Sequence, residues 1–331
     1  MPTPKVSIII CTYNQQDFVR ETVDSVVSQT YRNIEVIISD DGSTDATPAI
    51  LTEYAQRYPD IVKIVLSDRN TGIPANINRG LAIRTGELSA WLDGDDLMFP
   101  QKIEKQVAFL ASHPEAIGCY HDAEVFDSDS GQVLGRFSQL YNGSLTLLQG
   151  RLPDHIKPRY YSIPSSIMCR SEACPSHGFD ERMKYLSEFV FFTETFRPGL
   201  KLAMDEVLVR YRRHNRNVTS NVGFRAVSIE YELMAYAILE ARYPEFHFLW
   251  HKMRVSVLLT EAVRCIREGD IKRGTTILWN VWHEGAHLKA LSVLMATRLM
   301  PLMGGKVSQL TGGQPYNRPD WIKRIARRFL N

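Results

Sequence analysis

Buried strands and amphipathic helices alternate along the first 125 residues, and this alternation restricts the fold more than any other feature. Short apolar, β-branched runs occur at residues 6–10, 34–38, 62–66, 88–92 and 117–125, and helical patterns separate them at 17–27, 46–58, 73–83 and 102–110. Strands joined by helices in this order form a mostly parallel sheet with helices on its faces. Because such crossovers are right-handed, the carboxyl ends of the strands lie along one edge. The sequence therefore predicts an α/β fold with a ligand cleft at that edge.

Three polar clusters follow predicted strands and are expected to meet at this edge. They are residues 12–14 (TYN), 40–41 (DD) and 93–96 (DGDD). The three carboxylates of the last cluster repel one another unless a cation lies between them. Mg²⁺ and Mn²⁺ prefer oxygen ligands and often bridge protein carboxylates to substrate phosphates. Taken alone, the acidic turn fits a solvated loop equally well, but the convergence of the three clusters favours a metal site.

The side chains in these clusters are of the types that bind a nucleotide. The GxGxxG fingerprint of dinucleotide enzymes and the P-loop pattern are both absent after the first strand. Tyr13 can stack on a nucleobase, and Asp41 can accept a hydrogen bond from a base N–H such as that of uracil. Asp93, Asp95 and Asp96 can hold a ribose hydroxyl and a metal ion on a diphosphate. The sequence thus predicts a site for a nucleoside diphosphate that carries another group.

Charge and cysteine usage narrow the class of protein. The net charge of +2 gives no argument for a nucleic-acid partner. The five cysteines are scattered without metal-binding spacing, which is typical of reduced thiols. The sequence shows no signal peptide and no run of 18 apolar residues. We expect a cytoplasmic protein, with a peripheral position at the inner face of the cell membrane left open.

Five motifs together resemble the family 2 glycosyltransferases. They occur in the family's order at residues 7–14 (SIIICTYN), 25–31 (SVVSQTY), 40–45 (DDGSTD), 70–72 (NTG) and 93–96 (DGDD). The resemblance covers roughly residues 4–220. It implies the nucleotide-sugar transferase fold called GT-A, with a metal-dependent, inverting transfer of a sugar from a nucleoside diphosphate, in which UDP is expected from Tyr13 and Asp41. The acceptor would be a hydroxyl of a glycan or a lipid-linked oligosaccharide in surface polysaccharide synthesis.

The resemblance also implies roles for individual residues. The donor nucleotide would contact Thr12, Tyr13, Asn14, Asp41, Asn78, Asp93 and Asp95. The ligands of Mn²⁺ or Mg²⁺ would be Asp95, Asp96 and His214. The motif at residues 211–214 (YRRH) resembles the family's Tyr-Arg-x-His near the donor diphosphate, which gives Arg212 and Arg213 a weaker claim to phosphate contacts. One departure is that Ile77 occupies the position of a usual arginine, for which Arg79 is the candidate substitute.

The catalytic base is the second departure from the family pattern. The family carries Phe-Asp and then Glu-Asp, whereas this chain has Phe179-Asp180 followed by Ser187-Glu188. Counting from Phe179 places Glu188 at the position of the base, with Glu194 as the weaker candidate. Because glutamate is one methylene longer than aspartate, a degenerate transferase that only binds a nucleotide sugar or a membrane partner remains the alternative.

A change in composition marks the C-terminal third. We expect a catalytic domain at residues 1–222, divided near residue 100 into donor and acceptor halves, and a helical, basic region at 223–331. Residues 286–331 contain eight Lys or Arg and one acid, a net charge of +7. In residues 321–330 the apolar and basic side chains fall on opposite faces of a helix, a pattern typical of a membrane-surface helix. Packing on the catalytic domain or on a second copy of the chain, as a homo-oligomer, is the alternative.

Overall fold

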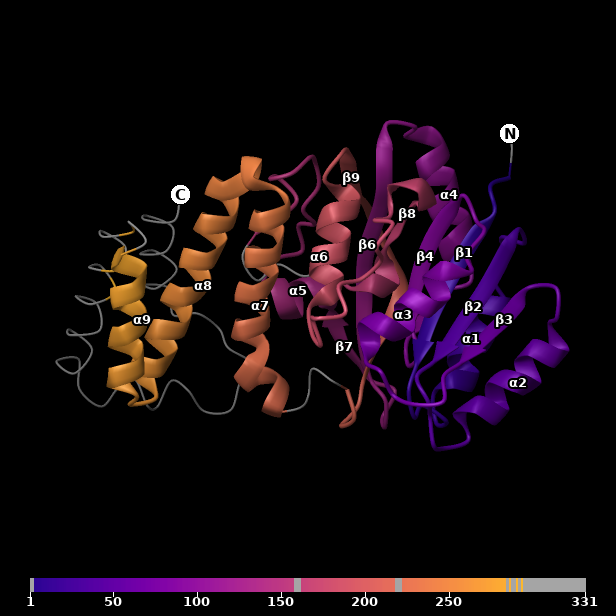
Figure 1. Cartoon of the computed structure of the whole chain (residues 1–331). Coiled ribbons are helices and arrows are strands. Elements are labelled where there is room, and N and C mark those ends of the chain that lie inside the picture. The colour runs from indigo at the N-terminus through magenta and orange to yellow at the C-terminus, as the bar shows by residue number, and fades with distance from the viewer. Residues whose placement is uncertain are drawn as a thin grey trace. The chain divides into compact units, whose positions relative to one another are not determined.

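The computed structural model describes residues 3–157, 162–217 and 222–283, together with residues 286, 290 and 293. For residues 222–227 only the backbone is described. The chain divides into two compact units, Met1–Glu245 and Phe246–Asn331. The first unit holds a central sheet with helices on both faces, and its elements are labelled in Figure 1.

Four parallel strands form the N-terminal half of this sheet. They are β1 (Val6–Thr12), β2 (Ile34–Asp40), β3 (Val62–Leu66) and β4 (Leu88–Asp93). The accompanying helices are α1 (Val19–Val27), α2 (Thr47–Arg57), α3 (Ile73–Ala82) and α4 (Lys102–Ser112). The strand order is β3-β2-β1-β4, and β1 pairs in parallel with both β2 and β4. The predicted alternation of strands and helices is confirmed.

Both long and short strands complete the sheet. They are β5 (Leu97–Met98), β6 (Ala116–Asp127), β7 (Val133–Arg136), β8 (Met168–Arg170) and β9 (Leu200–Arg213). From β4 the order continues β8-β6-β9-β5, and β7 pairs with β6. Strands β1–β4, β6 and β9 run in one direction, whereas β5, β7 and β8 run in the other. The expected α/β class with a mostly parallel sheet is confirmed, although the sequence predicted neither β5 nor β8.

The remaining elements of the acceptor half are short. They are α5 (Phe137–Asn142), α6 (Ser187–Phe196) and the 3₁₀ turns η1 (Pro164–Ser166) and η2 (Ser171–Ala173). The helix that carries Glu188 and Glu194 begins at Ser187, after a segment of turns that follows Phe179 and Asp180.

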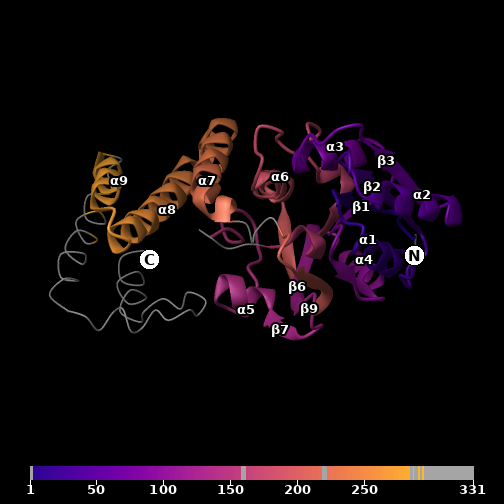
Figure 2. The ribbon, with the colours of Figure 1, turned by 90° about the horizontal axis from the view of Figure 1, so that it is seen from below.

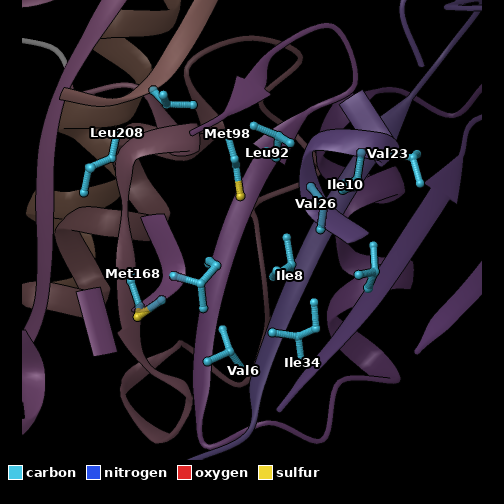
Figure 3. Packing of buried hydrophobic residues seen from close by; sticks show 14 of the residues in the cluster. Val6, Ile8, Ile10, Val23, Val26, Ile34, Leu92, Met98, Met168 and Leu208 are labelled. Carbon is cyan, nitrogen blue, oxygen red and sulfur yellow. The ribbon is translucent and has the colours of Figure 1, made fainter. Parts of the chain in front are cut away.

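Alternate side chains of the central strands feed two separate cores. Ile8 and Ile10 belong to a cluster that includes residues of α1, α2 and α4, and Figure 3 shows this packing around β1 and β4. Ile9 belongs to a second cluster with residues of α3 and α6. Helices α3 and α6 lie on the opposite face of the sheet from α1 and α4 (Figure 2). Burial of each such isoleucine stabilises the fold by about 1.5–3 kcal/mol.

The topology places a crevice at the carboxyl ends of β1 and β4. From β1 the chain runs outward to β2 and β3 on one side, and then returns to β4 on the other side. Ligands of open α/β sheets bind at such a reversal, outside the strand ends. Here the strand ends are Thr12 and Asp93.

The C-terminal helices fall into both units. Helix α7 (Val222–Arg242) groups with the first unit, beyond the boundary expected at residue 222. The turn η4 (Pro244–Phe246) leads into α8 (His247–Arg267) and α9 (Ile271–His283), which share a small core of Val255, Leu259, Leu278 and Val281. None of the helices in the described ranges is both long and apolar enough to span a membrane. The proposed membrane-surface helix at residues 321–330 lies outside the described residues.

Candidate functional site

The loop after β1 is tied to the loop after β2 by hydrogen bonds. Thr12 Oγ1 donates to Asp40 Oδ1 at 2.9 Å. The backbone N–H of Asn14, a residue with φ of 51°, donates to Ser43 Oγ at 2.7 Å. Between these two anchors the Tyr13 side chain is 45% exposed at the edge of the sheet. Thr12 and Asn14 therefore shape the loop, and Tyr13 presents an open aromatic face.

Asp41 is almost fully buried and is held by four donor groups. Its carboxylate accepts hydrogen bonds from Thr71 N and Oγ1, from Gly72 N at 2.7 Å, and from Arg79 Nη2 at 2.6 Å. Burial raises the pKa of Asp41, but the hydrogen bonds from Arg79, Thr71 and Gly72 outweigh it, so the pKa lies below its usual value. Asp41 is therefore a fixed negative charge beside Tyr13 at the strand edge.

Helix α3 presents Arg79 and Asn78 to different partners. Ile77, at the family's usual arginine position, is buried in the core, and Arg79 makes the ion pair with Asp41. Asn78 bonds instead to the backbone of Phe179, with Nδ2 donating to the carbonyl at 3.0 Å and Oδ1 accepting from the N–H at 2.7 Å. Both polar groups of Asn78 are thus engaged by protein, and its expected donor contact stays a prediction.

The acidic turn begins with Asp93 at the end of β4. Its backbone N–H donates to Ser165 Oγ at 3.2 Å. Burial raises the pKa of Asp93 to about 7, and the neighbouring charges of Asp95 and Glu188 contribute to this rise. The carboxylates of Asp93 and Glu188 are therefore close enough to influence each other across the cleft.

The glycine in this turn allows a close approach of β1 to β4. A Cβ atom on Gly94 would lie 2.0 Å from Gln15 Oε1 and 2.8 Å from the Cys11 carbonyl oxygen. The Gly94 N–H donates to the same Cys11 carbonyl at 3.1 Å. The turn therefore packs directly on the loop that carries Tyr13, and a side chain at position 94 would push the two apart.

Asp95 and His214 meet across the sheet edge. The distance from His214 Nε2 to Asp95 Oδ2 is 2.9 Å. The backbone N–H of Arg216 donates to Nδ1 at 3.2 Å, and Asn217 Nδ2 lies 3.1 Å from Nε2. Phe18 stacks on the imidazole with the ring centroids 4.4 Å apart. The predicted neighbourhood of these two side chains, one on the β4 turn and one after β9, is present in the structure.

Asp96 occupies a different environment from that of Asp95. Its side chain is fully buried, Oδ1 accepts from the Arg212 N–H at 3.0 Å, and Oδ2 accepts from Ser165 Oγ at 2.8 Å. Burial and the charges of Asp95 and Asp93 raise its pKa well above the usual value. With both oxygens bound to protein and closed to solvent, this carboxylate joins β4 to β9, and its expected role as a metal ligand stays a prediction.

The Arg212 side chain is likewise hydrogen-bonded within the protein. Its side chain is buried, Nε donates to the Asp95 carbonyl at 2.7 Å, and Nη2 donates to Glu21 at 2.5 Å. The guanidinium is thereby occupied, which corrects the phosphate contact considered for this residue. Arg213 of β9 lies opposite Asp127 of β6 in the strand register.

Glu188 lies in the first turn of α6. Helix α6 starts after Leu186, a non-glycine residue with φ of 59°, which turns the chain into the helix. Burial raises the pKa of the Glu188 carboxyl, and its charge reaches Asp93. A carboxyl group with a raised pKa in a cleft is suited to accept a proton.

Glu194, the weaker candidate for the base, is bound elsewhere. It accepts hydrogen bonds from Arg242 Nη1 at 2.8 Å and from Tyr243 Oη at 3.2 Å. Arg242 also bonds to Asp180 at 2.8 Å. Glu194 and Asp180 therefore anchor helix α7 in the first unit, and this geometry favours Glu188 over Glu194 as the base.

Two polar residues that the sequence did not single out complete the site. Asn217 Oδ1 accepts a hydrogen bond from the backbone N–H of His214 at 2.7 Å, and Asn217 Nδ2 lies 3.3 Å from Asp95 Oδ2. Ser165 bonds to both ends of the acidic turn, at Asp93 and Asp96. Neither residue was predicted from the sequence, because both act through neighbours in the fold.

Comparison with known proteins decides the family. A sequence model described as Glycosyl transferase family 2 matches residues 7–163. An uncharacterized glycosyltransferase of Haemophilus influenzae is 31% identical over 226 residues, which are 66% of this chain and 68% of that protein. The chain belongs to glycosyl transferase family 2. The chain spans about two fifths of the length of other curated relatives that it matches.

Solved structures show the same fold at low identity. TarS 1-349 of S. aureus in complex with UDP has a TM-score of 0.56 and 20% identity, over 77% of this chain and 71% of that one. The mannosyltransferase PcManGT of Pyrobaculum calidifontis, in complex with GDP-Man and Mn²⁺, has a TM-score of 0.58 and 18% identity, over 100% of this chain and 86% of that one. The GT-A fold expected for this family 2 member is confirmed.

The family 2 site can be tested for its fit to a divalent cation. Within the described residues, no three His, Cys, Asp or Glu side chains are grouped to hold a metal ion by themselves. Asp95 Oδ2 and His214 Nε2 nevertheless form an oxygen–nitrogen pair 2.9 Å apart. Mg²⁺ and Mn²⁺ commonly take one or two protein ligands and complete their coordination with substrate phosphates and water. The pair therefore fits a cation that arrives with a diphosphate.

Proposed function

We propose that this family 2 enzyme transfers a sugar with inversion from a nucleoside diphosphate, UDP in the first instance, to a hydroxyl of a glycan or lipid-linked acceptor. The observation that carries the proposal is the pairing of Asp95 with His214 at the end of the acidic turn, whose first residue, Asp93, is within reach of the charge of Glu188. Asp41 and Tyr13 lie at the same strand edge. The strand edge thus offers an aromatic face, a fixed carboxylate and a pair of groups that could bind a cation, and Glu188 adds a carboxyl group whose charge reaches Asp93.

The donor half would bind the nucleotide. Tyr13 would stack on the base and Asp41 would accept a base N–H, while the loops anchored by Thr12 and Asn14 hold both in place. Asp93 would bind the ribose, and Asp95 with His214 would hold Mn²⁺ or Mg²⁺. When bound, the cation supplies neutralisation of the charge that develops on the leaving diphosphate.

The acceptor half would supply the base. Glu188 takes the proton from the acceptor hydroxyl as its oxygen forms a bond to the anomeric carbon. The bond from that carbon to the diphosphate oxygen breaks with its electron pair, and the nucleoside diphosphate leaves from the opposite face. Glu188 ends protonated, and the sugar is joined to the acceptor with inverted configuration.

The test separates donor binding from transfer. We expect UDP with Mn²⁺ to bind the native chain in isothermal titration calorimetry, and Asp95→Ala to abolish that binding. Asp129→Ala, which removes an exposed acid of the β6–β7 turn, is the matched control and should bind normally. UDP binding that is unaffected by Asp95→Ala would contradict the proposed metal site.

The second arm addresses the base. Glu188→Gln should bind UDP and Mn²⁺ as the native chain does, while transfer falls by about 10²–10⁴-fold, the usual contribution of a general base. Transfer is followed by UDP release and by detection of the glycosylated product. A native chain that binds UDP but neither transfers nor hydrolyses any nucleotide sugar would support the alternative, a degenerate binding module.

A further inference from the structure

The segment before α6 is pinned to α3 at one point. Asn78 of α3 donates through Nδ2 to the Phe179 carbonyl and accepts through Oδ1 from the Phe179 N–H, at 3.0 and 2.7 Å. These paired bonds fix the orientation of the Phe179 peptide groups. Two depressions of about 290 and 490 Å³ adjoin this point, and Asn78 and Glu181 line both. Asn78 thus joins α3 to the segment that precedes α6, at a point that borders both depressions.

The neighbouring glycine is shaped to this contact. Gly178 has φ of 70°, and a Cβ atom there would lie 2.3 Å from Asn78 Oδ1. Any other residue at position 178 would carry backbone strain and press on the Asn78 amide. The close approach of these two segments therefore depends on both Gly178 and Asn78.

Phe179 transmits this anchoring to α6. Its side chain is buried and stacks on Phe191, with ring centroids 4.0 Å apart and an interplanar angle of 13°. Phe191 lies on α6, the helix whose first turn carries Glu188. A fixed Phe179 therefore fixes the rotation and depth of α6.

We propose that Asn78, through its paired hydrogen bonds to the Phe179 backbone, is a positioning residue that sets the place of Glu188 in the cleft. Asn78 is adjacent to Arg79, which holds Asp41 on the donor side. One turn of α3 thus contacts both Asp41, which is proposed to bind the nucleobase, and Phe179, which packs on the helix that carries Glu188. The inference rests on the proposed function, in which Glu188 removes the acceptor proton.

The experiment compares turnover with donor binding. Asn78→Ala and Gly178→Ala should each lower kcat by tenfold or more, because a displacement of the base by about 1 Å can cost 10²-fold in rate. The dissociation constant of UDP with Mn²⁺ should stay within twofold of the native value. Glu181→Ala is the matched control, because Glu181 accepts from Asn78 but leaves the bonds to Phe179 intact, and kcat should be unchanged.

The pH profile distinguishes positioning from general loosening. Burial raises the pKa of Glu188, and kcat depends on its deprotonated form, so kcat rises as the pH increases through that pKa. In Asn78→Ala, Glu188 should gain water, and the midpoint of this rise should move to lower pH. If Asn78→Ala does not fold, Asn78→Asp, which keeps the bond from the Phe179 N–H and loses the donor group, should show the same shift with a smaller loss of kcat.

Three outcomes overturn the inference. They are native kcat in Asn78→Ala and Gly178→Ala, a loss of UDP affinity in parallel with kcat, and an unchanged pH midpoint in the slowed variants. The second outcome would return Asn78 to the donor site. Transfer that survives in Glu188→Gln would instead contradict the proposed base itself, so the two failures are distinguishable.

Discussion

Folding raises the pKa of Asp93, the carboxyl group at the end of β4. Burial and the charges of Asp95 and Glu188 raise its pKa to about 7, compared with about 3.9 in an unfolded chain. A carboxyl group whose pKa is raised by folding opposes folding where it is ionised. As the pH rises from about 4 to 7, the metal-free protein should therefore lose stability through this group.

Replacement of Asp93 by asparagine should remove this cost. At pH 8 in the presence of EDTA, we expect Asp93→Asn to raise the melting temperature of the first unit by about 2–4 °C, the shift that 1 kcal/mol produces in a domain of about 150–250 residues. At pH 5, where Asp93 is already largely protonated, the variant and the native chain should melt together. An equal shift at both pH values would show that ionisation of Asp93 is not the cause.

The Asp93–Asp96 turn shows what residue-level prediction from the sequence could reach. The four letters of residues 93–96 predicted acids at the carboxyl end of a buried strand, and β4 ends at Asp93. The sequence could not separate Asp95 from Asp96, since one faces His214 and the other faces Ser165 and the β9 backbone. These partners are distant along the chain and are brought together only by the fold.

At the scale of elements, one buried carboxylate joins β4 to β9. Asp96 accepts from the Arg212 backbone, and Arg212 in turn donates to the Asp95 carbonyl and to Glu21 of α1. The connection therefore links the donor half of the sheet to its last strand. Loss of this connection should affect the fold before it affects chemistry.

Asp96→Ala should accordingly lower the free energy of unfolding by about 3 kcal/mol, since it removes two buried hydrogen bonds and leaves the Arg212 N–H without its acceptor. Asp96→Asn, which can retain both contacts, should remain within about 1 kcal/mol of the native chain. Urea denaturation measures both values. Native stability in Asp96→Ala would show that this carboxylate does not hold the two strands together.

Prediction of elements succeeded where local patterns were strong. Strands β1, β2 and β4 carry largely apolar runs, because both faces of the sheet are covered there, and the predicted runs overlap their observed bounds. Strands β5 and β8 contain two and three residues, too few for any periodicity, and exist because β9, β4 and β6 offer partners. The boundary of the first unit shifted to Glu245 for a similar reason, because α7 is held by ion pairs to Asp180 and Glu194.

At the scale of the whole molecule, donor binding should stabilise the folded chain. The proposed site draws on loops after β1, β2, β4 and β9, so a bound nucleotide and cation would favour the folded state over the unfolded one. At a concentration one hundred times the dissociation constant, the expected gain is about 2.7 kcal/mol. Thermal unfolding with Mn²⁺ and UDP, GDP or their sugars measures this gain and ranks the donors.

The matched variant for this measurement is Asp95→Ala, in which the shift with UDP and Mn²⁺ should disappear. A shift that persists without Mn²⁺ would contradict metal dependence. A larger shift with GDP than with UDP would correct the donor assignment and leave the cation site unaffected.

The pairing of Asp95 with His214 determines when, during synthesis of the chain, the proposed cation site can form. The two residues are 119 positions apart in the sequence, and His214 directly follows β9, the last strand of the sheet. During synthesis, β1–β4 emerge first with their base-recognition loops already complete. The cation site closes only when β9 has entered between β6 and β5. A nascent chain on the ribosome thus cannot capture a nucleotide sugar with its metal until nearly two thirds of the polypeptide has been made.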